Sequence, residues 1–278
     1  MRLYDQHVHS RHSGDSNIDP RGAVLRALEL GLAGLTFTEH YDVHPEDWPT
    51  CCYDDVAYSA DIAALRDEFG GDIAIGKGIE VCHQPDRMEG ILDLLARGGF
   101  DAVLLSVHWI DGGAGAIHDP GHWAGKTADQ MSRAYLASVL QATEFCVRLK
   151  QQGSNPFNIL GHLDLVRRYS QRFVGTDEPL GHADLVDGIL RNCLAAGLVP
   201  EINTSSLREG MAEPMPGAAV IRRYAELGGT AVALGSDSHV VEHVGAGLHQ
   251  AATMARHCGI DRLAVFKNRH IRTVPLAK

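Results

Sequence analysis

The sequence lacks the cysteine patterns and the long apolar segments that mark several classes of protein. Its six cysteines are scattered without C-x-x-C spacing, and charged residues interrupt the apolar stretch near its start. The spacing argues against a disulfide framework and a cysteine-rich zinc site, and no secretory signal is recognisable. No apolar run approaches the roughly 18 residues of a membrane span. We therefore expect a cytoplasmic protein with no membrane partner.

Positive charge is also scarce. The chain has 25 Lys and Arg against 35 Asp and Glu, a formal net charge of -10, and it contains no basic run. Aromatic residues make up 6% of it and form no stripe interleaved with Lys or Arg. The acidic excess disfavours unaided binding of a polyanion, so we expect no nucleic-acid partner. A small anion held by metal ions is compatible with this charge, because the ions reverse its local sign.

The length and composition that remain are those of an ordinary α/β domain. The chain has 278 residues, of which 45% are hydrophobic and 22% charged, with no internal repeat or low-complexity segment. An α/β barrel typically has about 250 residues. We therefore expect a single domain over residues 1–278.

Seven short, apolar, β-prone runs alternate with amphipathic helical stretches. The runs are 3–8, 34–38, 73–79, 102–107, 157–161, 198–202 and 230–235. The helical stretches are 19–30, 55–69, 85–97, 127–152, 182–196, 217–227 and 244–258. This alternation predicts a parallel sheet with helical crossovers.

A polar residue able to bind metal or substrate ends or closely follows every one of these runs. In chain order these residues are His7 and His9, Glu39 and His40, Glu80, His108, His162 and Asp164, Asn203, and Asp237 and His239. A parallel barrel gathers the carboxyl ends of its strands at one rim, so these side chains should converge there. Imidazole and carboxylate without thiolate suit zinc, manganese or iron(II). The segments 41–54 and 110–126 should form loops on the same rim.

The motifs that carry these residues resemble those of the PHP (polymerase and histidinol phosphatase) family. They are DQHVHS (5–10), TEH (38–40), GIE (78–80), VH (107–108), GHLD (161–164) and GSDSH (235–239). The histidinol-phosphatase branch is suggested more narrowly by the chain length and by GHLDLVRRY (161–169) and EINTSSLR (201–208).

The resemblance implies a fold and a ligand set. The fold would be a distorted (β/α)7 barrel, similar to a TIM barrel, with three divalent metal ions of zinc, manganese or iron. The first ion would take His7, His9, Glu80 and Asp237, and the second Glu80, His108 and His162. The third would take Asp15, His40 and His239, with His12 as a competitor for the place of Asp15.

The resemblance also implies an activity, metal-dependent hydrolysis of L-histidinol phosphate in histidine biosynthesis. Three divalent ions and the carboxylates of Asp15, Glu80 and Asp237 would leave a site charge of about +3, which suits a phosphate monoester of about −2. Our hypothesis is that a metal-bridging hydroxide attacks phosphorus, with Glu80, Asp237 and His239 as the catalytic residues.

Other residues near these motifs would bind the substrate, a small phosphorylated metabolite. Arg168 and Arg208 would hold the phosphoryl oxygens, with Arg167 as an alternative to Arg168, and Asn203 would lie on the substrate side. Acceptors for an amine or imidazole could be Glu39, Asp42 or Asp164, and stacking partners Tyr41 or Trp109. Asp164 could instead orient a ligand histidine. His118, His122, His243 and His249 match no family motif and are assigned to the surface or loops.

Other functions remain as alternatives. An amidohydrolase-type enzyme would commonly use a modified lysine as bridging ligand, whereas the fourth run offers His108, and Lys77 faces away from Glu80. A PHP phosphoesterase acting on another small phosphate monoester, on a nucleotide or on nucleic acid is a second. A non-catalytic metal-binding barrel is the third.

Overall fold

The computed structural model describes residues 2–176 and 181–276. Its strands are β1 (Tyr4–Val8), β2 (Gly34–Tyr41), β3 (Ala74–Cys82), β4 (Ala102–Ser106), β5 (Trp109–Ile110), β6 (Gly115–Ala116), β7 (Ile159–Leu160), β8 (Val199–Asn203), β9 (Ala231–Gly235), β10 (Arg262–Lys267) and β11 (His270–Pro275). Its helices are α1 (Pro20–Glu29), α2 (Asp55–Phe69), α3 (Met88–Arg97), α4 (Pro120–Trp123), α5 (Ala128–Gln151), α6 (Val166–Val174), α7 (Ala183–Ala196), α8 (Ser205–Arg208), α9 (Ala218–Glu226) and α10 (Leu248–His257). Short 3-10 turns lie at Trp48–Thr50, Pro85–Arg87, Asp111–Gly113 and Val241–His243.

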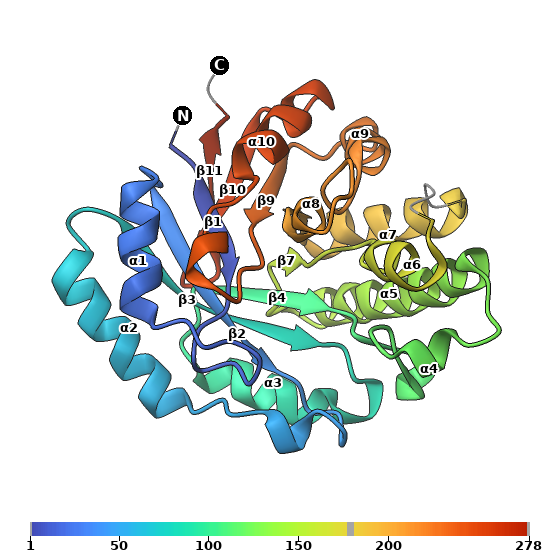
Figure 1. The fold of residues 1–278 in the computed structure, drawn as a ribbon, viewed down its shortest axis with the longest axis horizontal. Coiled ribbons are helices and arrows are strands. Elements are labelled where there is room, and N and C mark those ends of the chain that lie inside the picture. Colours follow the sequence, from blue (N-terminus) through green and yellow to red (C-terminus); the bar gives the residue numbers. More distant parts are fainter. Residues whose placement is uncertain (1, 177–180, 277–278) are drawn as a thin grey trace.

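The fold is mixed α/β, with one large and mostly parallel sheet surrounded by helices (Figure 1). Nine strands follow one another in the order β1-β2-β3-β4-β7-β8-β9-β10-β11, and only the last pair is antiparallel. Each of the seven predicted runs contains or overlaps a strand, and each predicted helical stretch contains a helix. The predicted alternation of strand and helix is therefore confirmed.

The two faces of the sheet belong to different apolar clusters. On β4, Val103 and Leu105 join the main core, whereas Ala102 and Leu104 join a smaller cluster with residues of β7, β8, β9 and β10. Alternate residues of a strand point to opposite faces, so both faces of β4 are buried. This explains why its sequence is a continuous apolar run rather than an alternating one.

The carboxyl end of β1 is fixed to the segment that follows β9. The carboxylate of Asp5 is buried and accepts hydrogen bonds from the backbone N–H groups of Ser236 and Gly245, both at 2.8 Å. The Asp237 N–H donates to the His7 carbonyl at 2.8 Å, and the His9 N–H donates to the Ser238 carbonyl at 3.0 Å. These bonds bring the first and last predicted site motifs together.

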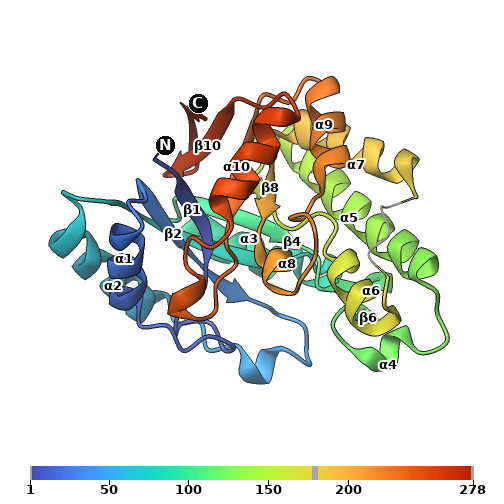
Figure 2. The same cartoon turned by 45° about the horizontal axis from the view of Figure 1, so that its top comes forward.

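The C-terminal hairpin of β10 and β11 was not expected from the sequence. It extends the sheet beyond β9, and Arg272 of β11 donates to the Tyr4 hydroxyl at 3.2 Å, beside the start of β1 (Figure 2). The buried carboxylate of Asp101 accepts from the Asn268 N–H at 2.9 Å and lies 3.2 Å from Lys267 Nζ. The hairpin therefore packs at the amino ends of the strands, away from the site residues.

Helix α6 was also not predicted. It begins directly after the GHLD motif and carries Arg167 and Arg168, so it positions the branch-specific arginines. No helix within residues 2–176 and 181–276 is long and apolar enough to cross a membrane.

Candidate metal centre

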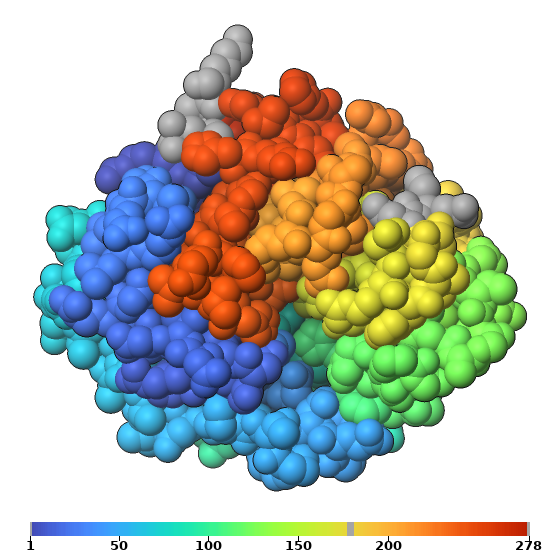
Figure 3. Space-filling view, viewed as in Figure 1, coloured from blue at the N-terminus to red at the C-terminus, as the bar shows by residue number. Residues whose placement is uncertain are grey.

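A cavity of about 760 Å³ opens at the carboxyl ends of the strands. Figure 3 shows a hollow near the middle of this face, where segments from distant parts of the chain meet. Seven of the nine predicted ligands line it, namely Asp15, His40, Glu80, His108, His162, Asp237 and His239. The other two, His7 and His9, are fully buried and lie within 4 Å of Glu80.

Four ligand side chains form a first group around the end of β1. The Nε2 atoms of His7 and His9 lie 3.0 Å apart. Glu80 Oε2 lies 3.3 Å from His7 Nε2 and 3.5 Å from His9 Nε2. Asp237 Oδ1 lies 3.7 and 3.5 Å from the same two nitrogen atoms. Two imidazole nitrogens and two carboxylate oxygens thus converge on one point.

Hydrogen bonds on the far side of both rings place a proton on each Nδ1. His7 Nδ1 lies 2.7 Å from Glu201 Oε1, and a carboxylate accepts, so Nδ1 carries the hydrogen. His9 Nδ1 lies 3.2 Å from Ser13 Oγ, whose hydroxyl donates to Glu39 and must therefore accept from His9. Both Nε2 atoms are thus turned toward each other, 3.0 Å apart, and toward the carboxylates of Glu80 and Asp237, an arrangement that suits the binding of one cation.

Glu80 connects this first group to a second. Its Oε1 atom lies 2.9 Å from His162 Nε2 and 3.6 Å from His108 Nε2. Ser106 donates a hydrogen bond to the same oxygen at 2.5 Å. Because Oε2 faces His7 and Oε1 faces His162, one carboxylate has the geometry of a bridge between two cation sites.

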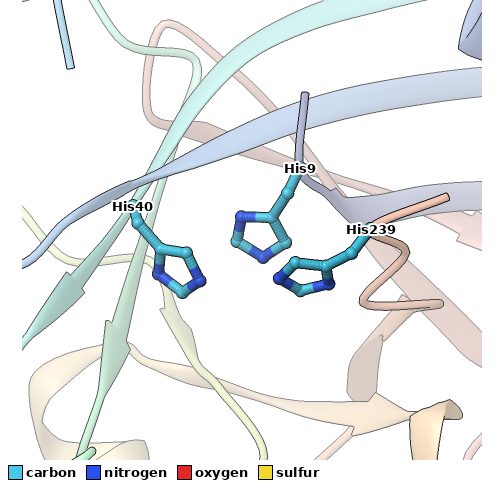
Figure 4. A group of neighbouring side chains, drawn as sticks. All are labelled: His9, His40 and His239. Carbon is cyan, nitrogen blue, oxygen red and sulfur yellow. The ribbon is translucent and has the colours of Figure 1, made fainter. Parts of the chain in front are cut away.

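The third group lies at the mouth of the cavity. Asp15 Oδ2 lies 3.0 Å from His239 Nε2 and 3.5 Å from His40 Nε2. Figure 4 shows the His9 ring between those of His40 and His239, and it stacks on them with ring centroids 4.2 and 4.3 Å apart. His12 does not join this group, because its Nε2 lies 2.8 Å from Asp61 Oδ2.

The charges of the site suit cation binding. Burial, together with the neighbouring His40 and His239, lowers the pKa of His9 to about 3, so His9 is neutral. Burial raises the pKa of Glu80, but the imidazoles of His7 and His40 outweigh burial and hold it well below its usual value. The same balance, led by His7, keeps Asp237 ionised. Neutral imidazole and ionised carboxylate are the forms that bind metal.

Several buried atoms of the cluster lack a hydrogen-bond partner. Within the described part of the chain, His162 Nδ1 has none, and His40 Nδ1 and Asp42 Oδ1 have only ion-pair contacts, among them those of His40 Nδ1 with Asp42 Oδ2 at 3.3 Å and of Asp42 Oδ1 with His108 Nδ1 at 3.6 Å. Buried polar atoms are normally paired, and those left over mark places where an ion or water is expected. Imidazole and carboxylate groups within 4.8 Å of one another recur around Glu80 and around His9. The residues present therefore fit bound divalent ions.

Two arginines line the same cavity. Arg168 Nη1 donates to Ser205 Oγ at 3.0 Å and lies 3.6 Å from Asp237 Oδ2. Arg208 donates to the backbone carbonyls of Ser236 and Asp237 at 2.7 and 2.9 Å. Arg167 instead donates to Asp164 at 3.2 Å and does not line the cavity. Of the two candidates in the RRY motif, Arg168 is the one that faces the predicted ligands.

Other sequence interpretations differ from the structure. Asn203 is fully buried and does not line the cavity; its amide donates to Glu201 at 3.2 Å and to Asp237 at 3.3 Å. Glu39 is also fully buried, and its carboxylate accepts hydrogen bonds from Ser10 and Ser13 behind His9. Neither residue is placed to touch a substrate. Tyr41, Asp164 and Trp109 are likewise absent from the main cavity, whereas Asp42 lines it.

Sequence reasoning missed several residues of the site. Glu201 orients His7 and also accepts from the His162 backbone N–H at 2.9 Å, yet it was given no role. It stands two residues before Asn203 on β8, hence on the same face, and that spacing was a usable signal. His118 and His243 line the cavity, although both were assigned to the surface or loops. His249 is exposed, and His122 lies outside the main cavity.

Comparison with known proteins places the chain in a family. The PHP domain model matches residues 5–205. The histidinol-phosphatase of Lactococcus lactis subsp. lactis (strain IL1403) is 29% identical over 276 residues, which cover 98% of this chain and 97% of that protein. The histidinol-phosphatase of Bacillus subtilis (strain 168) is 24% identical, covering 88% of this chain and 96% of its own length.

Solved structures agree with this match. The crystal structure of histidinol phosphate phosphatase from Lactococcus lactis, complexed with zinc, L-histidinol and phosphate, superposes with a TM-score of 0.83 at 28% identity and covers 98% of this chain and 99% of that one. A putative histidinol phosphatase from Listeria monocytogenes, 21% identical with a TM-score of 0.73 over 89% of this chain and 99% of that one, shows the same fold. The family model matches residues 5–205, more than half of the chain, so this chain belongs to the PHP domain family.

Proposed function

We propose that this protein is a metal-dependent histidinol-phosphatase, which hydrolyses L-histidinol phosphate to L-histidinol and phosphate. The observation that carries the proposal is the convergence of all nine predicted ligands at one cavity that Arg168 and Arg208 also line. The similarity to the Lactococcus lactis enzyme, whose crystal structure holds zinc, L-histidinol and phosphate, supports the choice of substrate.

The ligand assignment is part of the proposal. His7, His9, Glu80 and Asp237 would hold one ion, Glu80 with His108 and His162 a second, and Asp15, His40 and His239 a third. Zinc, manganese and iron(II) all suit imidazole and carboxylate donors. When bound, such ions activate water and offset the charge of the phosphoryl oxygens.

The protein side chains would bind and orient the substrate around these ions. Arg168 and Arg208 would each hold phosphoryl oxygens through the planar guanidinium fork, which matches phosphate geometry. Asn203 would act indirectly, since its amide contacts the carboxylate of Asp237. Glu80, Asp237 and His239 would be the catalytic residues, because each has ligand atoms facing the cavity.

We also propose how the fold holds this centre. Residues 1–278 would form one domain, and the bonds between the end of β1 and the segment after β9 would close the first seven strands of the large sheet into a distorted (β/α)7 barrel. A barrel places the carboxyl ends of all strands at one rim, which accounts for the convergence of the ligands.

Phosphate release tests the proposal. Purified protein loaded with zinc, manganese or iron would be assayed on L-histidinol phosphate, nucleoside monophosphates and a short oligonucleotide side by side, with bound metal measured by elemental analysis. We expect a clear preference for L-histidinol phosphate, loss of turnover on chelation, and a loss greater than about 100-fold in Asp237→Asn. Faster hydrolysis of a nucleotide than of L-histidinol phosphate would show that the substrate is a nucleotide instead. Absence of hydrolysis in metal-replete protein would favour a non-catalytic barrel.

A further inference from the structure

Asp47 lies where the main cavity meets a second cavity, which we call the annex. The annex holds about 640 Å³ and shares Asp47 and His118 with the main cavity. Its wall also includes Glu46, Trp109 and His122. The two cavities therefore adjoin at these residues, and Asp47 lines the same cavity as the predicted ligands.

Asp47 differs from the other carboxylates that line the main cavity. Each of those lies within 4.0 Å of an imidazole or guanidinium nitrogen; they are Asp15, Asp42, Glu80, Glu209 and Asp237. Among the described residues, Asp47 has no such cationic partner. A carboxylate on a cavity wall without a cationic partner is a natural acceptor for a cationic ligand group.

The Asp47 side chain is held in place by a neutral contact. Its Oδ2 atom accepts a hydrogen bond from Trp109 Nε1 at 2.5 Å. The Trp109 ring in turn stacks on the His44 ring, with centroids 3.4 Å apart. The other oxygen, Oδ1, accepts no hydrogen bond from any described residue. One oxygen of Asp47 thus fixes the carboxylate, while the second stays free to bind.

The charged residues that line the two cavities also favour a cationic group near Asp47. Arg168 and Arg208 line the main cavity, and neither lines the annex. No Lys or Arg is among the described residues that line the annex, whereas Glu46, Asp47 and Asp119 are. Phosphate is therefore favoured at the metal centre, and a cationic group is favoured at the annex.

We propose that Asp47 is a specificity-determining residue, whose free carboxylate oxygen accepts a hydrogen bond from the ammonium group of an amino-alcohol phosphate held at the metal centre. This inference rests on the proposed function and deepens it. It assigns the amine end of the substrate to the junction with the annex, in place of Glu39 and Asp164, which do not reach the main cavity.

A pair of substrates tests the inference. Asp47→Asn keeps the size of the side chain and removes its charge. We expect kcat/KM for L-histidinol phosphate to fall about ten- to a hundredfold, mainly through KM, and that for the amine-free glycerol phosphate to stay unchanged. Asp47→Glu, which keeps the charge, should restore part of the loss. Asp72→Asn is the matched control, because Asp72 is exposed and precedes β3 at the end opposite to Glu80.

Calorimetry of L-histidinol binding in the presence of inorganic phosphate gives a readout without turnover. Asp47→Asn should weaken this binding by the same factor as it raises KM, and Asp72→Asn should leave it unchanged. Equal losses for both substrates, or no loss of L-histidinol binding, would overturn the inference. Absence of turnover of L-histidinol phosphate by the unaltered enzyme would instead refute the proposed function, and the binding comparison would still decide the role of Asp47.

Discussion

Glu201 Oε1 lies 2.7 Å from His7 Nδ1, and both side chains are fully buried. Burial alone lowers the pKa of His7, but the carboxylates of Glu201, Glu80 and Asp237 hold it well above its ordinary value. The second oxygen of Glu201 accepts from the His162 N–H at 2.9 Å. A single carboxylate therefore fixes one ligand of the first group and the backbone of one ligand of the second.

Replacing this carboxylate by an amide should weaken metal binding. Three N–H donors face the Glu201 side chain, from His7, His162 and Asn203. In Glu201→Gln, at least one of them meets an amide NH₂ instead of an acceptor, and a buried unpaired donor costs about 1–3 kcal/mol. Changes to groups that orient metal ligands typically cost about 10- to 100-fold in metal affinity or activity. Competition with a chelator measures this affinity directly. Wild-type affinity in Glu201→Gln would show that Glu201 does not orient His7.

Asp42 provides a similar contact on the other side of the cavity. Its Oδ2 atom lies 3.3 Å from His40 Nδ1, and its Oδ1 atom lies 3.6 Å from His108 Nδ1. We expect Asp42→Asn to lower metal affinity by about 10- to 100-fold, because one of the two imidazoles then meets an amide NH₂ instead of the acceptor that fixes its orientation. Elemental analysis after limited dialysis checks this, with Asp47→Asn as the control that contacts none of the predicted ligands. Equal metal content in the two variants would contradict the expectation.

A substitution of Arg168 tests whether its guanidinium group binds phosphate. Lys keeps the positive charge but loses the planar fork that binds two oxygen atoms at once. We expect Arg168→Lys to raise the inhibition constant of inorganic phosphate by about ten- to a hundredfold, the worth of one charge-assisted hydrogen bond. Arg172→Lys serves as the control, because Arg172 is half exposed and does not itself line the cavity, although it pairs at 2.8 Å with Glu209, which does. A similar rise of this inhibition constant in both variants would show that Arg168 does not bind phosphate.

The sequence predicted the positions of the ligands better than the groups that orient them. His7, Glu80 and His162 could be found because each ends an apolar run, and parallel strands bring such ends together. Glu201 has its role only through the ring of His7, which a distant segment supplies, and no local pattern records such a contact. Asn203 was misplaced for a related reason, because a polar residue at a strand end can face either a ligand or another buried side chain.

The loops and the C-terminal segment were the least predictable parts. Asp47 and His118 belong to the two rim loops that the sequence indicated, but loop composition does not show which side chains reach the cavity. The β10–β11 hairpin was missed because β11 is mostly exposed and carries polar residues at half of its positions. Its place depends on the buried carboxylate of Asp101, which lies far away in the sequence.

His83 lies outside the ligand cluster, and we expect its titration to make the stability of the protein depend on pH. Its side chain is buried beside Phe145, and burial, reinforced by the charge of Arg148, lowers its pKa from 6.5 to about 4. Between about pH 4 and 6.5 the unfolded chain therefore binds a proton that the folded protein does not. Stability rises with pH in this window and falls as the pH drops through it.

The size of the effect follows from the width of the window. Lowering the pH from 6.5 to 5 should cost the wild type about 2 kcal/mol more than His83→Gln, at about 1.36 kcal/mol per pH unit. Urea unfolding of both proteins in chelator at pH 7 and pH 5 measures this, since the titration of the metal ligands is common to both and cancels in the comparison. The variant differs from the wild type in packing as well, but that difference does not change with pH. Parallel losses of stability in the two proteins would show that His83 is protonated in the folded state at pH 5.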